Sequence, residues 1–285
     1  MVTNIPGAVI LWMFGAIASF TLMAVGGREL SAELDTFGIL FVRSLVGLFV
    51  VLIMLARSGW RFAGTQRFGQ HLIRNLVHFG GQFGWFFALA LLPLAQVFAL
   101  EFTTPLWAIV LAVLVLRERI TTRRVLALIL GFIGVMIILR PGVIPISVGV
   151  AAALGSAVCY AVSLVMTKRM IKTEAPVTIL FYMTVIQLPI ALVAAWPNLV
   201  MPSTNLWPWV VAVGLSALGA HYCLARAFTV SDASVVLPID FLRLPVIALV
   251  GAAVYGESVE IFLFLGAALM VIGNMISLTA ERKPA

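Results

Sequence analysis

Charged residues are scarce in this sequence: Asp, Glu, Lys and Arg make up 10% of its 285 residues, whereas 63% are hydrophobic. A soluble domain carries roughly 25% charged residues, so this chain lacks the polar side chains to cover a water-exposed surface. Its apolar runs extend for about twenty residues, without the period-two alternation of a membrane β-barrel. The composition therefore predicts an integral membrane protein built from helices.

Motifs for catalysis and for cofactor binding are also missing. The sequence has no Gly-Lys-Ser/Thr phosphate loop, no zinc-type spacing of Cys and His, and no Gly-x-Ser-x-Gly turn. Its two cysteines, Cys159 and Cys223, lie in apolar segments, as small packing residues do. We therefore expect a protein that is not an enzyme, with no catalytic residues, metal or cofactor.

Ten apolar spans are separated by charged, proline-rich or polar clusters: 5–25, 36–56, 70–91, 94–115, 123–139, 146–166, 176–196, 207–228, 233–255 and 259–279. Each can cross a hydrocarbon core of about 30 Å, the fifth being the shortest. Thirteen basic residues lie at the loops after even-numbered spans and in the C-terminal tail, against two, Arg28 and Arg140, on the opposite side. This asymmetry predicts a multi-pass protein of the inner (plasma) membrane with both termini in the cytoplasm.

The net charge of +7 does not indicate a nucleic-acid partner, because membrane orientation explains the basic loops. The expected partners are the lipid bilayer and a small-molecule substrate. Small residues in spans 5 and 10, such as Gly134 and Gly273, suit close helix packing at the periphery or between subunits. We expect a monomer, and dimerisation through these two spans is left open.

The two halves of the sequence repeat with an offset of 139 residues, which superposes Gly80 on Gly219 and Glu101 on Asp240. With five spans per half, the second half enters the membrane in the opposite sense. The predicted fold is all-α: two inverted five-helix repeats, residues 1–140 and 141–285, around a central cavity. Such a repeat can expose one site alternately to each side, which predicts a transporter; an inert duplicated scaffold is the alternative.

Two acidic residues lie inside spans, Glu101 in span 4 and Asp240 in span 9. A charge in hydrocarbon costs roughly 2.5–3.5 kcal/mol or more, so such residues are candidates for substrate binding or proton transfer. Thr104 and Arg243 follow them three residues later, also at equivalent positions. The alternative is structural: Asp240 and Arg243 form an i,i+3 ion pair and only neutralise each other.

Each of these spans also contains a proline, Pro105 or Pro245. A proline inside a helix releases the carbonyl four residues earlier, here those of Glu101 and Phe241. We therefore expect free carbonyls beside the acids, suited to a cation or an ammonium group.

Span 3 carries a polar stripe, because Asn75, His78, Gln82 and Trp85 recur at spacings of three and four. His221, in span 8, is the counterpart of Gln82. A polar stripe does not face lipid, although the histidines could merely bond a neighbouring backbone. The predicted substrate-binding residues are His78, Gln82, Trp85, Glu101, Thr104, Trp107, Tyr160, His221, Asp240 and Arg243. Arg43, in span 2, is expected to be structural, by pairing with one of the acids.

Several segments resemble a known family: Ala88-Leu-Ala-Leu-Leu-Pro-Leu-Ala-Gln-Val, Thr104-Pro-Leu-Trp, Arg117-Glu-Arg, Leu130-Gly-Phe-Ile-Gly-Val and Tyr255-Gly-Glu. In these motifs, and over nearly its whole length, the chain resembles the ten-span EamA-type transporters of the drug/metabolite transporter superfamily. The resemblance implies two pseudo-symmetric halves around a cavity, with export of small metabolites. Glu118 and Glu257 match the family's glutamates at the ends of spans 4 and 9, which we interpret as structural.

Together these patterns favour a secondary transporter that exports small metabolites from the cytoplasm by alternating access. Amino acids, aromatic or apolar ones first, are the expected substrates, since amino-acid exporters form a branch of the family. An importer of a vitamin-like or nucleoside-containing metabolite with the same fold is the alternative. A membrane enzyme or structural subunit is a third hypothesis, and it predicts no solute flux.

Overall fold

The computed structural model describes residues 7–116, 121–140, 147–170, 173–230, 236 and 239–280. These residues contain helices and no strand, so the predicted all-α fold is confirmed. The first half comprises α1 (Gly7–Leu30), α2 (Thr36–Ser58), the short 3-10 helix η1 (Trp60–Ala63), α3 (Phe68–Leu91), α4 (Leu94–Glu101), α5 (Thr104–Leu116) and α6 (Thr122–Leu139). The second comprises α7 (Val148–Met170), α8 (Pro176–Ala195), the 3-10 helices η2 (Trp196–Asn198) and η3 (Thr204–Leu206), α9 (Trp207–Val230), α11 (Arg243–Tyr255) and α12 (Ile261–Ala280).

Six apolar segments in the described part of the chain are long enough to cross a membrane: Gly7–Leu30, Thr36–Arg57, Leu94–Leu111, Val148–Thr167, Val177–Asn198 and Thr204–Leu224. Val125–Leu139, Arg243–Tyr255 and Ile261–Ile276 are shorter apolar helices. Large apolar side chains, including Phe14, Phe49 and Val193, remain exposed on the protein surface. Such a surface suits lipid as the surrounding solvent.

Spans 4 and 9 are not the single helices that the sequence predicts. Helix α4 ends at Glu101, a turn occupies 102–103, and α5 begins at Thr104; in the second half a turn at 241–242 precedes α11. Pro105 and Pro245 lie in the first turn of α5 and α11, where a missing N–H costs no helical hydrogen bond. The prolines therefore start new helices and do not interrupt one continuous helix.

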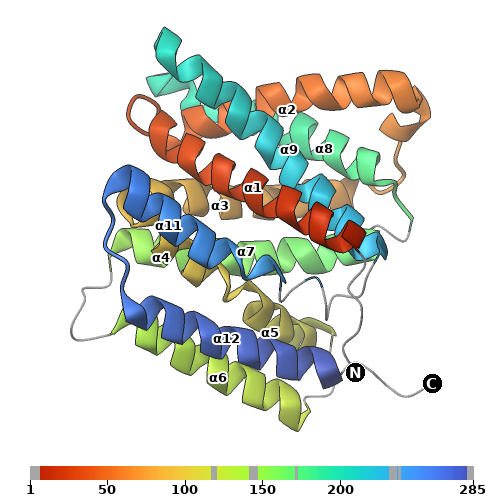
Figure 1. Cartoon of the computed structure of the whole chain (residues 1–285). Helices are drawn as coiled ribbons and strands as arrows, with labels where there is room; N and C mark the ends of the chain where they lie inside the picture. Colours follow the sequence, from red (N-terminus) through yellow and green to blue (C-terminus); the bar gives the residue numbers. More distant parts are fainter. Residues whose placement is uncertain are drawn as a thin grey trace.

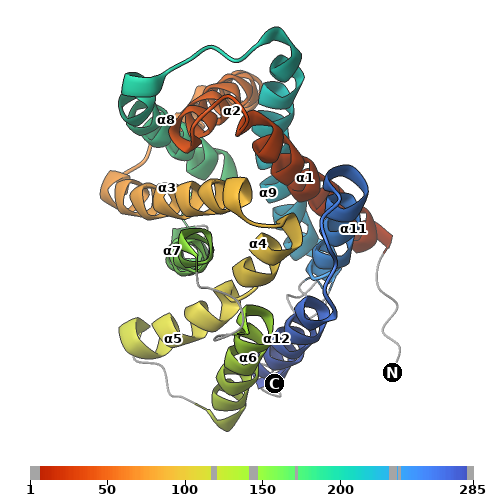
Figure 2. The same cartoon turned by 90° about the vertical axis from the view of Figure 1, so that its left-hand side faces the viewer.

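Helix pairing follows a two-fold pseudo-symmetry (Figures 1 and 2). Helix α1 packs along α9 and α3 along α7, while α2 packs on α8, α4 on α11 and α6 on α12. The repeat relates α1 to α7 and α3 to α9, so it exchanges the first two pairs, and it maps the α2–α8 and α6–α12 pairs onto themselves. Helix α11 is the counterpart of α5, so the α4–α11 contact is not one of these self-related pairs. Helix α1 begins and α12 ends at the same end of the bundle (Figure 1), which suits an even number of crossings. The predicted boundary between residues 140 and 141 adjoins 141–146, which lie outside the described residues.

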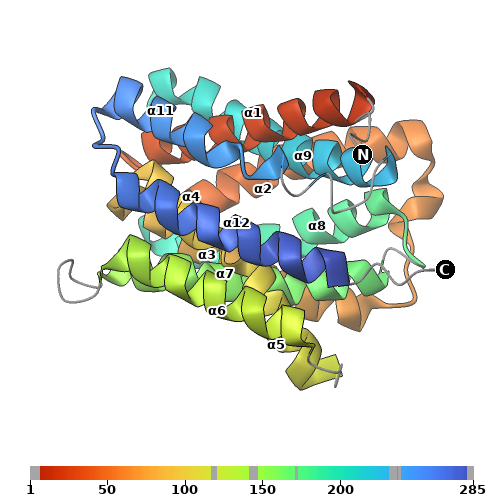
Figure 3. The ribbon, with the colours of Figure 1, turned by 60° about the horizontal axis from the view of Figure 1, so that its bottom comes forward.

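Helices α6 and α12 lie side by side (Figure 3), along the lower edge of the molecule in the view of Figure 1. A Cβ atom added at Gly134 would lie 2.5 Å from the carbonyl oxygen of Gly266, and one added at Gly266 would lie 2.5 Å from that of Gly134. Glycine at both positions therefore lets the two backbones touch. The close packing predicted for spans 5 and 10 occurs within one chain.

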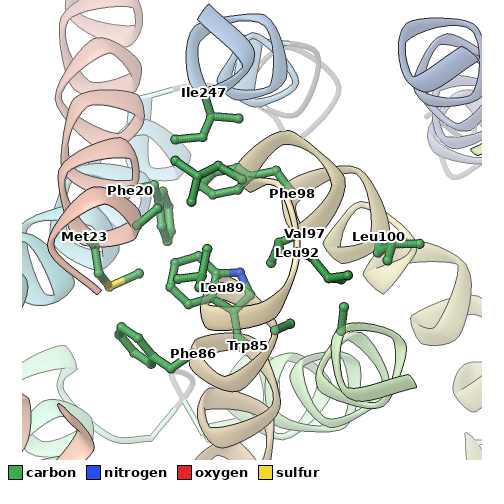
Figure 4. Packing of buried hydrophobic residues seen from close by; sticks show 14 of the residues in the cluster. Phe20, Met23, Trp85, Phe86, Leu89, Leu92, Val97, Phe98, Leu100 and Ile247 are labelled. Carbon is green, nitrogen blue, oxygen red and sulfur yellow. The ribbon is translucent and has the colours of Figure 1, made fainter. Parts of the chain in front are cut away.

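The main apolar core joins α1, α3, α4 and α11 (Figure 4). Phe20 from α1, Trp85 from α3, Phe98 from α4 and Ile247 from α11 converge there. The Trp85 and Phe98 rings are 5.8 Å apart. This core holds α4, and the helix break that follows it, against the second half of the molecule.

Candidate substrate site at two helix breaks

The helix breaks of the two halves face each other. Phe102 and Phe241 are repeat-equivalent turn residues, and their ring centroids lie 4.6 Å apart in an edge-to-face arrangement. Glu101 and Asp240 immediately precede these turns. The contact between these equivalent turns therefore brings the two intramembrane acids close to the pseudo-symmetry axis.

One guanidinium serves both acids. Arg243 donates through Nη2 to Asp240 Oδ2 at 2.8 Å, and its Nη1 lies 3.5 Å from Glu101 Oε1. The i,i+3 pair expected as the structural alternative is present, and it extends across the repeat to Glu101. Three aromatic rings have centroids within 6 Å of the guanidinium carbon: Phe20, Phe98 and Phe102. We call Glu101, Asp240 and Arg243 the ion triad.

The two acids differ in how completely they are bonded. Trp85, only 2% exposed, donates its indole N–H to Glu101 Oε2 at 2.8 Å, so both carboxylate oxygens of Glu101 have a partner. Asp240 Oδ1 is buried and has no hydrogen-bond partner in the described structure. Within the ion triad, the carboxylate oxygen that lacks a partner is therefore the Asp240 Oδ1, in the second half of the chain.

The carbonyls beside the acids are occupied, so the expectation that they are free to bind a cation is wrong. Thr104 Oγ1 donates to the Glu101 carbonyl at 2.6 Å, and the Leu244 N–H donates to the Phe241 carbonyl at 3.1 Å. The acceptors that the prolines leave unpaired are satisfied locally at each helix start.

A second polar group lies on α3, α7, α8 and α9. The rings of His78 and His221 are 6.1 Å apart, and His78 lies 5.6 Å from Tyr160. Gln187 Nε2 donates to the Asn75 carbonyl at 3.2 Å and lies 3.1 Å from His78 Nδ1. We call His78, Tyr160 and His221 the histidine group. Sequence reasoning missed Gln187, although a lone amide within an apolar span is itself a signal.

Gln82 is the least satisfied polar side chain near these groups. It is 3% exposed, and neither its Oε1 nor its Nε2 has a hydrogen-bond partner in the described structure. It lies between His78 and Trp85 on one face of α3, at spacings of four and three residues. A buried amide without partners costs about 1–3 kcal/mol, unless a ligand or water completes it.

Phe20 connects the ion triad and the histidine group. Its ring lies 6.1 Å from that of His221, and the Arg243 guanidinium carbon lies 4.3 Å from its centroid. The sequence offered no specific signal for Phe20, one aromatic residue in an apolar span. Of the ten residues predicted to bind substrate, nine lie in the ion triad, in the histidine group or on the helix segments next to them.

Trp107 is the exception among the predicted site residues. It is 37% exposed on α5, and no hydrogen bond or ring contact joins it to either group in the described structure. A role for these ten residues in binding substrate stays a prediction.

Arg28, near the end of α1, joins the end of α3 to the segment that follows α11. Its Nε donates to the Leu89 carbonyl at 2.5 Å, its Nη2 donates to the Leu92 carbonyl, and its Nη1 donates to Glu257 Oε1 at 3.2 Å. The other Glu257 oxygen accepts from the Leu94 N–H at 2.8 Å, at the start of α4. These contacts agree with the structural role expected for Glu257. Glu118 lies outside the described residues.

The sequence matches the EamA-like transporter family twice, at residues 7–140 and 147–279. The two matches divide the chain as its repeat does. The chain belongs to the EamA-like transporter family.

Curated relatives of this EamA-like chain span nearly its full length. A riboflavin transporter of Vibrio cholerae is 32% identical over 267 residues, which cover 92% of this chain and 90% of that protein. An S-adenosylmethionine uptake transporter of Rickettsia prowazekii is 23% identical over 96% of this chain and 93% of that protein. A pseudopaline exporter of Pseudomonas aeruginosa is 26% identical over 95% and 96%.

A solved crystal structure shares the fold of this EamA-like chain, with a TM-score of 0.65 and 22% identity over 98% of this chain and 100% of that one. Family and relatives identify the protein as a membrane transporter of small molecules and point away from an enzyme. The predicted export of amino acids receives no support from these relatives. The alternative, import of a vitamin-like metabolite, agrees with them better.

Proposed function

We propose that this protein imports a flavin-like metabolite across the inner membrane by alternating access. Two relatives that are 32% identical, from Vibrio cholerae and Brucella anthropi, are named riboflavin transporters. The S-adenosylmethionine uptake transporters are more distant, at 23–24% identity for the Rickettsia proteins. Both names denote a substrate with a heteroaromatic ring, and the S-adenosylmethionine proteins are named for uptake.

The unpaired amide of Gln82 is the observation that carries the proposal. A flavin ring is planar, and its pyrimidine edge alternates hydrogen-bond acceptors with an N–H donor. A glutamine amide presents one acceptor and a two-proton donor, and so can bond such an edge at two points. His78 and Tyr160 lie beside Gln82 and supply aromatic surface for the ring.

The ion triad suits the polyol chain of such a substrate. Asp240 Oδ1 has no partner in the described structure and can accept a hydrogen bond from a hydroxyl. Arg243 balances one of the two carboxylate charges, so the ion triad favours a neutral hydroxyl donor over an anionic group of the substrate. We assign His78, Gln82, Tyr160 and His221 to the ring, and Glu101, Asp240 and Arg243 to the chain. In this assignment Trp85 and Thr104 position Glu101, and Trp107 has no contact with substrate.

The proposal includes the topology read from the basic loops. Both termini lie in the cytoplasm, and residues 1–140 and 141–285 form the two halves that move against each other. Reporter fusions at either terminus test this orientation: activity of a periplasmic reporter at the C-terminus would contradict it.

Uptake of labelled riboflavin into proteoliposomes of known orientation tests the substrate. Gln82→Leu should lower uptake at least tenfold and leave thermal stability unchanged or raised, because an amide without protein partners contributes no bond to folding. Gln70→Leu, on the exposed start of the same helix, is the matched control and should transport normally.

Three outcomes would be decisive. Wild-type protein that carries no riboflavin would refute the substrate, and a Gln82→Leu variant with normal uptake would refute the site. The relative named a pseudopaline exporter supports outward carriage as a second candidate. Faster flux out of right-side-out vesicles than into them would favour it.

A further inference from the structure

A small polar pocket lies between α2, α8 and α9, near the middle of each helix. Its lining combines polar and small apolar side chains: Arg43, Ser44, Gly47, Met183, Thr184, Gln187, Gly214, Ala217 and Leu218. Gly214 keeps α9 close to α2 there, since an added Cβ would overlap the Val46 side chain. None of the ten residues predicted to bind substrate lines this pocket.

Arg43 is a buried cation that has no counterion among the residues that the structure describes. It is 5% exposed, its Nε has no hydrogen-bond partner, and no described carboxylate lies within 4.0 Å of it. The expected pairing of Arg43 with Glu101 or Asp240 is wrong, because Arg243 pairs with both acids. An uncompensated buried charge is strongly unfavourable, so the site calls for an anion.

The other polar groups around Arg43 carry no negative charge to replace that anion. Ser44 and Gln187 are buried beside it in the pocket wall, and Thr184 donates its hydroxyl to the Phe181 carbonyl at 2.9 Å. Tyr160, His78 and His221 interact electrostatically with Arg43, and none of them is a carboxylate. The Gln187 amide nitrogen already donates to the Asn75 carbonyl and lies against His78. Arg43 and the Ser44 hydroxyl are therefore the groups in the pocket wall left to donate to carboxylate or phosphate oxygens.

We propose that this pocket binds an anionic oxygen group, a carboxylate or a phosphate, with Arg43 as its counterion. Gln187 connects the pocket to the histidine group through its hydrogen bonds to Asn75 and His78. An anion on Arg43 would thus lie next to the residues that we assign to the substrate ring. The inference goes beyond the import of an uncharged flavin and does not depend on it.

Thermal unfolding of the purified full chain in detergent tests the pocket, with inorganic phosphate compared against chloride at equal ionic strength. At a phosphate concentration a hundredfold above Kd, the wild-type Tm should rise by about 5–10 °C. Because phosphate also stabilises proteins non-specifically, Arg57→Gln, which removes an exposed charge from the same helix, is the matched control. It should shift as the wild type does, whereas Arg43→Gln should not. Equal shifts in all three proteins, or no wild-type shift, would overturn the proposal.

If Arg43→Gln does not fold, the variants Arg43→Lys and Ser44→Ala test whether the pocket binds phosphate. Each should fold and weaken the phosphate-specific shift, because lysine lacks the planar fork of donors and alanine lacks the hydroxyl. Shifts equal to that of the wild type in both variants would contradict the pocket.

The source of the anion is resolved by comparing riboflavin 5′-phosphate with inorganic phosphate. If the substrate carries the anion, the flavin phosphate should raise the Tm at a concentration at least tenfold lower, and Arg43→Gln should abolish that difference. If riboflavin 5′-phosphate and inorganic phosphate raise the Tm at the same concentration, the pocket binds a free ion. A wild type that carries no riboflavin would refute the proposed function and leave the phosphate result unchanged.

Discussion

The helix break after Glu101 and the helix break after Asp240 occupy equivalent positions. The residues three positions after the two acids, Thr104 and Arg243, nevertheless make different contacts. Thr104 closes its break locally, by donating its hydroxyl to the Glu101 carbonyl. Arg243, at the matching position, reaches out of its own break to bind both acids. The backbone at the two breaks is therefore similar. The side chain at this one position decides whether the break bonds only to itself, as Thr104 does, or also binds the other half, as Arg243 does.

The difference concentrates the charge balance of both breaks on Arg243. One guanidinium faces two carboxylates, and among the described residues only Glu101 has a further donor, the Trp85 indole. The residue equivalent to Trp85 in the second half is Leu224, which has no polar group. Substitutions at these positions should consequently have unequal effects in the two halves.

Loss of the shared arginine should have the largest effect. Arg243→Gln leaves both acids without their cation and should lower the free energy of unfolding by about 3–5 kcal/mol, as breaking a buried ion pair does. Denaturant titration in mixed micelles measures this loss, with Arg57→Gln as the exposed control. A change below about 1 kcal/mol would mean that the acids do not depend on Arg243.

Replacing either acid should cost less, because Arg243 keeps one carboxylate. Asp240→Asn removes the 2.8 Å contact and should lose about 1.5–3 kcal/mol. Glu101→Gln removes the 3.5 Å contact and should lose less, since its amide oxygen can still accept from Trp85. Denaturant titration of both variants gives the ranking, and the reverse order would show that the two contacts are not used as described.

Trp85→Phe probes the donor found only in the first half. The variant keeps an aromatic ring in the core but leaves Glu101 Oε2 without its partner. Hydrogen bonds within membrane bundles reach about 1.7 kcal/mol, and this charged one should lie near that value. In the Glu101→Ala background the same substitution should cost measurably less. An unchanged cost there would show that Trp85 stabilises only by packing.

Thr104→Val should have the smallest effect, about 0.6 kcal/mol, the average for a hydrogen bond within a membrane bundle. Valine has a similar shape and leaves the Glu101 carbonyl unpaired, whereas Thr104→Ser keeps the hydroxyl and should resemble the wild type. Thermal unfolding of the pair tests this assignment. Equal unfolding midpoints for the two variants would show that the Thr104 hydroxyl does not stabilise the helix break after Glu101.

Much of the architecture was predictable because lipid imposes strict requirements. Ten spans, the 139-residue repeat and the equivalence of Glu101 and Asp240 all follow from apolar run length and from residue spacing. The helix breaks were not predicted, although Pro105 and Pro245 were recognised. A proline fits either a kinked helix or the first turn of a new one, and the surrounding packing decides between them.

The sequence by itself determined that this chain spans a membrane as two repeated halves, because apolar run length and the positions of intramembrane charges can be read one residue at a time. Only the tertiary structure decided which charges are paired. Arg243 lies three residues from Asp240 but 142 residues from Glu101, and Arg43 could have paired with either acid. Helix packing alone places one arginine between two carboxylates and leaves the other buried, with no carboxylate partner in the described part of the chain.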